Sequence, residues 1–251
     1  LAPLVDDSGQ GNDITDIGGT DPVWGATTGF GESGAYDFSA DRLIAPIDVN
    51  PGVMPQMTWG AWVRTDDISS GLRKILGHDN GAWDRTLGLD NRAPDGTPAR
   101  YTAFTGDDAV NGSGPVEGTP EAASTTDWSF VAASHDQELK KVTVYVDLDA
   151  STTGDAVQSF TEPAGFGAGF PTFAIGGLRP DNAAEAWDGA IDNVFIFAGV
   201  LSDAVVQNLR DLGKAAFIEA DNFRITAIVP NEDGTVTLTW DSSPRAGTLY
   251  S

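Results

Sequence analysis

Hydrophobic and polar positions alternate with a period of two along most of the chain, which is typical of β-strands with one buried face. The clearest run is Thr58–Arg64, where bulky and small residues alternate, and it predicts a central strand. Lys141–Val146 alternates as regularly, so we expect one face of that strand to contact water. Further short strands are expected at 35–38, 42–45, 74–77, 86–89, 128–134, 173–176 and 189–197.

Strands that recur between turn residues predict an all-β fold, a two-sheet antiparallel jelly-roll β-sandwich. Within it, the aromatic residues Trp59, Trp62 and Phe130 are expected to fill the space between the sheets. A pair of these rings that pointed outward would instead form a binding platform.

One segment, 201–209, follows a helical period instead. Ser202 is the expected N-cap, Val205, Val206 and Leu209 form the apolar stripe, and Gly213 ends the helix.

The chain beyond this helix predicts a short C-terminal β-tail. The runs 223–229 and 235–240 flank Asn231-Glu232-Asp233-Gly234, a combination that indicates a β-hairpin. Thr248-Leu249-Tyr250 resembles the start of a third strand. We therefore divide the chain into a jelly roll at 1–213 and a linker with a hairpin tail at 214–251. The tail packs on the main domain, pairs with another chain, or belongs to a longer module.

Charge changes the picture of possible partners. The formal net charge is −23, and Asp and Glu together number 37. Such a surface repels phosphate backbones and anionic lipids, so we expect no nucleic-acid partner. No apolar run reaches the length that crossing a bilayer requires, so we expect no membrane-spanning segment. The sequence contains no cysteine, which excludes disulfides, thiolate zinc sites and thiol nucleophiles.

A series of motifs resembles the laminin-G-like jelly rolls of the concanavalin A-like lectin/glucanase superfamily. Their order and spacing match from residue 4 to about 213. The matching segments are 7–13, 36–38, 57–63, 128–132, 144–147, 175–177 with 187–194, and the closing Leu201-Ser202. Phe130 replaces the histidine that is usual in the family, and Leu148 replaces a glycine. The resemblance implies a jelly roll with, in many members, one structural Ca²⁺.

The same resemblance favours a secreted or cell-surface protein, exported by a bacterium. The tail from residue 223 resembles a segment that follows such domains in exported bacterial proteins. The chain also begins at Leu1 without Met, which fits removal of a signal peptide or a trimmed sequence.

Calcium is the first candidate ligand. The resemblance places Ca²⁺ between the N-terminal segment and the last core strand, and the matching oxygen donors are Asp7, Asn12, Asp13 and Asp192. Asp192 lies beside Ile191 in an apolar strand, where a carboxylate is costly unless a cation or hydrogen bonds compensate. The alternative is that the N-terminal acids are solvated turn residues and that Asp192 accepts hydrogen bonds from loop amides.

A glycan is the second candidate ligand. The polar loop between the strands at 74–77 and 86–89 carries carboxylate, amide, guanidinium and indole groups, a set that suits sugar hydroxyls and C–H faces. The candidate ligand-binding residues are Asp79, Asn80, Trp83, Asp84 and Arg85 in this loop, with Tyr101 and Trp187 on the same surface. The alternative is a loop bonded to itself, with Arg85 paired to a neighbouring aspartate.

Enzymatic signatures are missing from the sequence. Glycoside hydrolases of this fold carry an E-x-D-x-x-E strand, and this chain has no such run. Only His78 and His135 could act as imidazole bases, and His135 is expected in a turn after its strand. We therefore expect no catalytic residues in this chain. A further possibility is that the chain is an accessory domain of a larger hydrolase. The expected function is a non-catalytic module that binds a glycan or glycoprotein. The alternative is a structural or self-assembling surface or filament subunit that associates through edge strands.

Overall fold

The computed structural model describes most of the jelly roll and the tail hairpin. The described residues are 4–6, 10–14, 16–18, 21–29, 34–69, 71–80, 85–90, 99–104, 123–139, 141–147, 156–159, 169–177, 185–212, 224–230 and 236–241. Within them, no helix combines the length and apolarity that crossing a bilayer requires.

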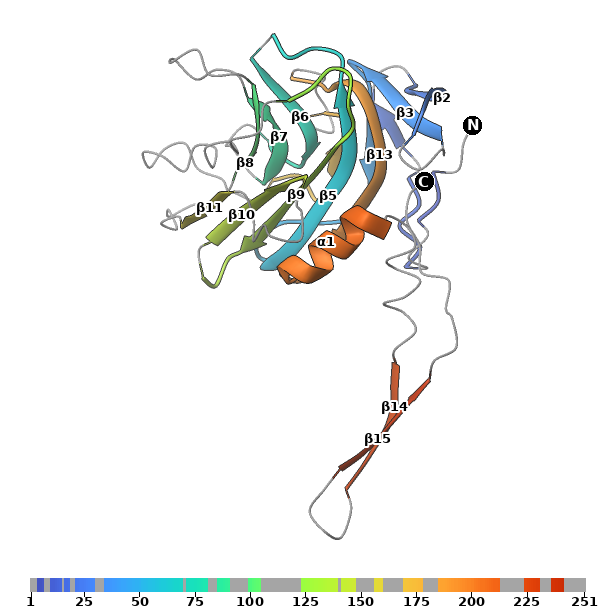
Figure 1. The fold of residues 1–251 in the computed structure, drawn as a ribbon, viewed down its shortest axis with the longest axis vertical. Helices are drawn as coiled ribbons and strands as arrows, with labels where there is room; N and C mark the ends of the chain where they lie inside the picture. The colour runs from blue at the N-terminus through green and yellow to red at the C-terminus, as the bar shows by residue number, and fades with distance from the viewer. Residues whose placement is uncertain are drawn as a thin grey trace.

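Two antiparallel sheets face each other, and helix α1 (Asp203–Leu212) lies across the outer face of one of them (Figure 1). The six-stranded sheet has the order β1 (Asp16–Gly18), β4 (Arg42–Ala45), β12 (Phe173–Ile175), β6 (Leu72–Gly77), β7 (Thr86–Asp90) and β8 (Arg100–Phe104). The seven-stranded sheet has the order β11 (Ala156–Ser159), β10 (Lys141–Val146), β9 (Ser129–Asp136), β5 (Gln56–Thr65), β13 (Asp188–Phe197), β3 (Gly34–Ser39) and β2 (Val23–Thr28). The predicted jelly-roll sandwich is confirmed.

The main core lies between the two sheets, with Trp59 of β5 at its centre. Trp59 is fully buried, and its ring meets Phe173 and His135 edge-on with centroids 5.9 Å apart in each pair. Aliphatic residues from both sheets, such as Ile75 and Val131, complete this cluster. The alternating pattern of β5 therefore places its odd-numbered positions inside the sandwich, as predicted for Trp59.

A second core lies on the outer face of the seven-stranded sheet, beneath helix α1 (Asp203–Leu212). Trp62 and Phe130 belong to this cluster, with ring centroids 5.6 Å apart, and Val206 and Leu209 of α1 cover them. The prediction that both rings fill the space between the sheets is wrong, because even-numbered positions of β5 point outward. They are buried all the same, since the helix covers them.

The helix begins directly after the predicted cap Ser202 and runs to Leu212. The Ser202 carbonyl accepts hydrogen bonds from the amides of Val205 and Val206 at 2.9 and 3.0 Å, as expected for an N-cap residue. Val206 and Leu209 are buried as predicted, whereas Val205 is exposed. The apolar stripe is therefore narrower than predicted.

The outward face of strand β10 is exposed at Lys141 and buried beyond it. Of its outward residues, Thr143 and Tyr145 are buried, although alternation predicts exposure. The reason is tertiary: the Tyr145 hydroxyl donates a hydrogen bond to Asp203 at the start of α1, 3.1 Å away. The segment that leads into the helix thus covers this part of the sheet.

The predicted tail hairpin is present as β14 (Arg224–Pro230) and β15 (Val236–Asp241), which pair antiparallel. Among the described strands they pair only with each other, and Figure 1 shows them apart from the sandwich. The predicted third strand at 248–250 and the boundary near 213 lie outside the described residues, so the division at 213/214 stays a prediction.

A buried basic cluster, formed by His78, Arg85 and His135, lies at one end of the sandwich interior. The Arg85 guanidinium donates hydrogen bonds to the carbonyls of Val49, Met54 and Pro55 at 3.0, 2.6 and 3.2 Å. His135 lies within β9 rather than in a turn after it, which corrects the sequence prediction.

Both histidines of the chain are held in the neutral form. Burial lowers the pKa of His78 to about 4, against the opposing effect of the Phe170 carbonyl, 3.3 Å from its Nδ1. Burial also lowers the pKa of His135 well below its usual value, and the charge of Arg85 acts in the same direction. For Arg85, burial lowers the pKa to about 10, so it remains charged at neutral pH. The cluster therefore carries one positive charge, and further protonation is unfavourable.

This cluster predicts loss of stability in mild acid. The folded pKa of each histidine lies below the unfolded value of about 6.5, so below that pH the unfolded chain binds protons that the folded chain does not. The free energy of unfolding is therefore unaffected by the histidines above about pH 6.5, and it decreases as the pH falls toward 4. Between pH 7 and pH 5 we expect the free energy of unfolding to fall by about 2 kcal/mol per histidine.

Urea denaturation at the two pH values measures this loss. His135→Gln, which removes one of the two groups, should remove about half of the difference between the two pH values. Equal stability of the wild type at pH 7 and pH 5 would contradict the neutral assignment.

Candidate functional site

The loop predicted to bind a glycan is divided between the interior and the surface. Asp79 is buried and Asn80 is exposed, while Trp83 and Asp84 lie outside the described residues. Arg85 belongs to the buried basic cluster and donates to backbone carbonyls of 49–55. It therefore organises that loop from inside the protein. The alternative, a loop bonded to itself with Arg85 paired to a neighbouring aspartate, stays a prediction, because Asp84 lies outside the described residues.

Tyr101 and Trp187 are the other two predicted glycan contacts, and both are fully buried. They belong to the core cluster between the sheets. Burial raises the pKa of Tyr101 to about 12, so its hydroxyl stays protonated. Together with Arg85, these residues are removed from any ligand-contacting surface, which corrects the prediction for three of its seven residues. Asp79, Asn80, Trp83 and Asp84 stay predictions.

The residues predicted to bind calcium lie in a turn near the N-terminus and on β13. Asp13 accepts a hydrogen bond from the Asp6 amide, and Asp6 accepts one from the Asn12 amide, both at 2.8 Å. The carboxylates of this turn thus satisfy backbone amides. Asp7, the remaining predicted ligand here, lies outside the described residues.

Asp192 is buried on β13, as predicted, and one of its oxygens accepts a hydrogen bond from the Asn193 amide at 2.8 Å. It borders a cavity of about 30 Å³ whose other lining residues, such as Ile14, Phe38 and Ile175, are mostly apolar. Within the described ranges, no three acidic or histidine side chains form a group that could hold a metal ion. Calcium binding at these residues stays a prediction, since Ca²⁺ also accepts amide and backbone carbonyl oxygens.

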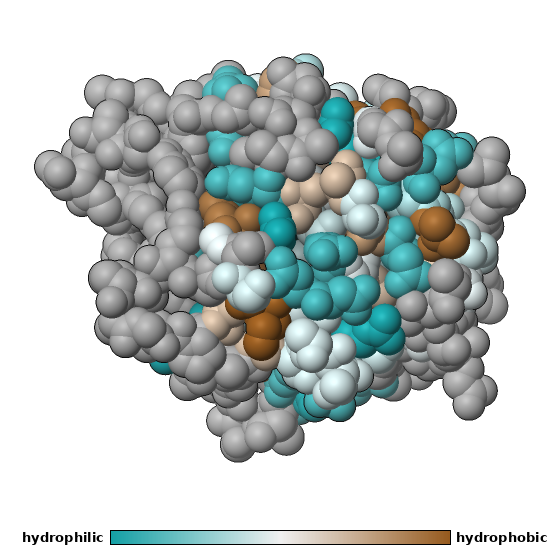
Figure 2. Space-filling model, turned by 90° about the horizontal axis from the view of Figure 1, so that it is seen from above, coloured by the Kyte–Doolittle hydropathy of each residue, from teal (hydrophilic) through white to brown (hydrophobic). Residues whose placement is uncertain are grey.

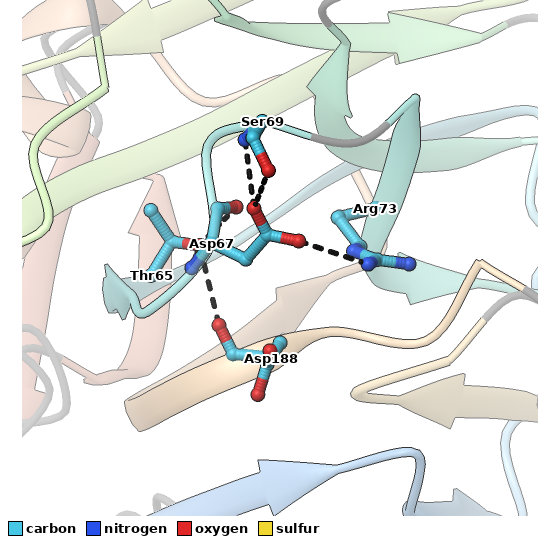
Figure 3. Close-up of polar contacts among 5 residues, drawn as sticks. All are labelled: Thr65, Asp67, Ser69, Arg73 and Asp188. Carbon is cyan, nitrogen blue, oxygen red and sulfur yellow. Dashed lines mark hydrogen bonds and ion pairs between the residues drawn. The ribbon is translucent and has the colours of Figure 1, made fainter.

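A polar cluster that the sequence analysis did not single out joins β5, β6 and β13 (Figure 3). The Asp67 carboxylate accepts hydrogen bonds from the Ser69 amide and hydroxyl at 2.7 and 2.6 Å, and it pairs with Arg73 at 3.1 Å. The Thr65 hydroxyl lies 2.9 Å from the Asp67 carbonyl and 3.2 Å from the Asp188 carbonyl. These groups bond to one another, so the cluster stabilises a turn.

A second cavity, of about 170 Å³, lies on the outer face of the seven-stranded sheet beside the start of α1. We call it the helix-side cavity. Its lining residues come from β9, β10, the turn between them and the segment before α1: Ser134, Asp136, Leu139, Lys141, Thr143, Tyr145, Val200, Leu201 and Asp203. The sequence analysis named none of them as ligand contacts, because their positions read as an ordinary solvent-facing strand surface.

Surface hydrophobicity offers no other clear site on the face that Figure 2 shows. Hydrophobic residues there are scattered among hydrophilic ones instead of forming one broad patch (Figure 2). Isolated apolar side chains on a surface are ordinary and need no ligand to explain them. The helix-side cavity is larger than the cavity beside Asp192 and has a more polar lining, which suits a small polar ligand.

Comparison with known proteins supports the fold. Among curated proteins, no sequence matches the chain significantly. Domain 4 of AbnA, a GH43 extracellular arabinanase from Geobacillus stearothermophilus solved in complex with arabinotriose, is similar with a TM-score of 0.55 at 18% identity. That match covers 81% of this chain and 92% of the domain.

Two other solved structures are similar to the chain at lower scores. The native heptameric SAP-like pentraxin from Limulus polyphemus matches at 12% identity and a TM-score of 0.46, covering 77% of this chain and 82% of its own. The CBM40 of Ruminococcus gnavus IT-sialidase, bound to α2,3 sialyllactose, matches at 17% identity and a TM-score of 0.44, covering 77% and 97%.

A family model gives the assignment. The Laminin_G_3 model matches residues 45–207, which include β5 to β13 and the start of α1. This range covers more than half of the sequence and most residues of both cores described above. The chain therefore belongs to the concanavalin A-like lectin/glucanases superfamily.

Proposed function

We propose that this chain is a non-catalytic carbohydrate-binding module that acts outside the cell. The observation that carries the proposal is the family match over residues 45–207, together with a complete two-sheet sandwich. The similar arabinanase domain, which binds arabinotriose and belongs to an extracellular enzyme, supports the same function and location.

The chemistry of the interior supports binding without catalysis. Both histidines of the chain are buried, and burial lowers the pKa of each, so neither is placed to exchange protons with a surface ligand. The sequence has no cysteine to act as a nucleophile. Burial of the histidines thus disfavours a histidine-based mechanism, and the composition disfavours a thiol-based one. The self-assembling alternative rests on the tail hairpin and edge strands, and no contact among the described residues favours it over binding.

Affinity electrophoresis through gels that contain single polysaccharides tests this proposal. We expect the chain to be retarded by at least one neutral polysaccharide, such as arabinan, relative to its migration in a gel without polysaccharide. A non-binding acidic protein of similar size serves as the mobility control. Unchanged migration in every gel of a broad panel would count against carbohydrate binding.

Structural calcium is a further part of the proposal, through Asp192 with Asp7, Asn12 and Asp13. The physical reason is the cost of keeping the Asp192 carboxylate buried at 4% exposure, which a bound cation would offset. A ligand that binds only the folded chain raises its stability by RT ln(1 + [L]/Kd).

We therefore expect the melting temperature to rise when CaCl₂ replaces EGTA, and Asp192→Asn to abolish the rise. At a Ca²⁺ concentration of 100 times the Kd, the gain would be about 2.7 kcal/mol. MgCl₂ at the same ionic strength is the control, because Mg²⁺ prefers a smaller octahedral site. A melting temperature that is equal in CaCl₂ and EGTA would remove the calcium proposal.

A further inference from the structure

The helix-side cavity is lined by polar side chains that are buried more deeply than strand surfaces usually allow. Ser134 and Thr143 face each other across β9 and β10 and are 3% and 6% exposed. Tyr145, two residues along β10, is 2% exposed. Hydroxyl groups at this depth are costly unless hydrogen bonds satisfy them. Their concentration in a recess of about 170 Å³ distinguishes it from the apolar cavity beside Asp192.

The contacts within the cavity leave capacity for a ligand that both donates and accepts hydrogen bonds. The Tyr145 hydroxyl donates to Asp203, and Asp136 accepts from the Leu139 amide at 2.9 Å. A carboxylate has about four lone-pair sites, so each of these aspartates can accept further bonds. The hydroxyls of Ser134 and Thr143 both bond to the Tyr145 hydroxyl, and each of them has a second hydrogen-bonding position left for a ligand. This mixture matches the hydroxyl groups of a sugar.

Charge selects among sugars. Two carboxylates, Asp136 and Asp203, border the cavity, and Lys141 supplies one ammonium group, which leaves a net negative charge. The chain as a whole carries −23. A sugar that bears a carboxylate would be repelled both at the cavity and at a distance, whereas a neutral sugar would not.

Size and the rim fit a single sugar ring. A cavity of about 170 Å³ has room for on the order of ten water molecules, enough for one pyranose or furanose ring but not for an oligosaccharide. Leu139 and Val200 border the opening and are 71% and 43% exposed. Their apolar surfaces suit the C–H face of a ring, and the remaining sugar units of a chain would lie outside.

We propose that the helix-side cavity binds one neutral sugar residue of a polysaccharide, with the Asp136, Thr143 and Asp203 side chains bonded to its hydroxyls and Val200 against its C–H face. This inference rests on the proposed carbohydrate-binding function and adds a location and a ligand class to it. The cavity lies beside the helix on the outer face of the seven-stranded sheet.

Isothermal titration with neutral trisaccharides (arabinotriose, xylotriose and mannotriose) and with acidic trigalacturonate tests the proposal. We expect at least one neutral trisaccharide to bind and trigalacturonate not to bind. Val200→Arg, which places a long side chain at the opening, should weaken binding by about tenfold or more. Thr143→Val, which removes one hydroxyl at nearly constant volume, should weaken it by about fivefold.

Val53→Arg is the matched control, since Val53 is an exposed valine that does not line the cavity, and its affinity should equal that of the wild type. Melting temperatures confirm that each variant folds. Amide chemical-shift changes in the wild type should gather on β9, β10 and residues 199–203, and this readout does not depend on any variant.

The possible failures are distinct. If a neutral trisaccharide binds but both variants retain full affinity and the shifts lie elsewhere, the site is overturned while carbohydrate binding stands. Binding of trigalacturonate alone overturns the neutral ligand class. If no saccharide binds the wild type, the inference and the proposed function fail together.

Discussion

Burial of β5 on both faces is the constraint on which the rest of the structure depends. Trp59 points between the sheets and Trp62 points outward beneath α1, so the strand is enclosed on both sides. Between them, Gly60 lies so close to β9 that an added Cβ would come within 2.5 Å of the Val131 carbonyl oxygen. The close approach requires glycine. Because an outward tryptophan cannot be left in water without loss of stability, the chain needs a helix that returns across this sheet.

The limited reach of that helix explains the cavity. Val206 and Leu209 cover the aromatic residues of β5, β9 and β13, where the outer face is apolar. Toward β10 the outer face carries Ser134 and Thr143 instead, and the helix does not cover it with apolar side chains. The Tyr145–Asp203 hydrogen bond marks the boundary between the two regions. A polar recess beside an apolar contact follows directly from this change in side chains along the sheet.

The sequence predicts most of the elements because strand alternation and helix caps are local, but it misses the strands β1, β2, β8 and β11. The central strand, the helix and the tail hairpin all lie within a few residues of their predicted bounds. It is harder to predict what buries each face of a strand. Alternation shows only that successive side chains point to opposite faces, not which element covers each face. Trp62 is therefore placed on the wrong side by sequence reasoning, and Tyr145 is wrongly expected to contact water.

The candidate site is harder still to predict, because its determinants are distant in sequence. Arg85 occurs in a loop whose composition suits a sugar, yet the carbonyls that engage it come from residues about 30 positions earlier. Trp187 and Tyr101 likewise have the right composition for ligand contact but lie in the core. The helix-side cavity combines two adjacent strands with a segment that begins more than 50 residues later, at Val200. No local pattern connects these parts.

The distribution of charge connects the interior with the proposed ligand. Among the described residues, the basic side chains of Arg42, Lys74 and Arg85 are buried with the two neutral histidines, while the net charge of the chain is −23. Carboxylates therefore dominate the charge that an approaching ligand meets. Such a surface gives no long-range attraction to a neutral polysaccharide, so affinity must come from short-range hydrogen bonds and C–H contacts in a recess. It also excludes acidic polymers before contact. A small polar cavity on an acidic protein is thus suited to selecting neutral sugars by contact and repelling acidic ones at a distance.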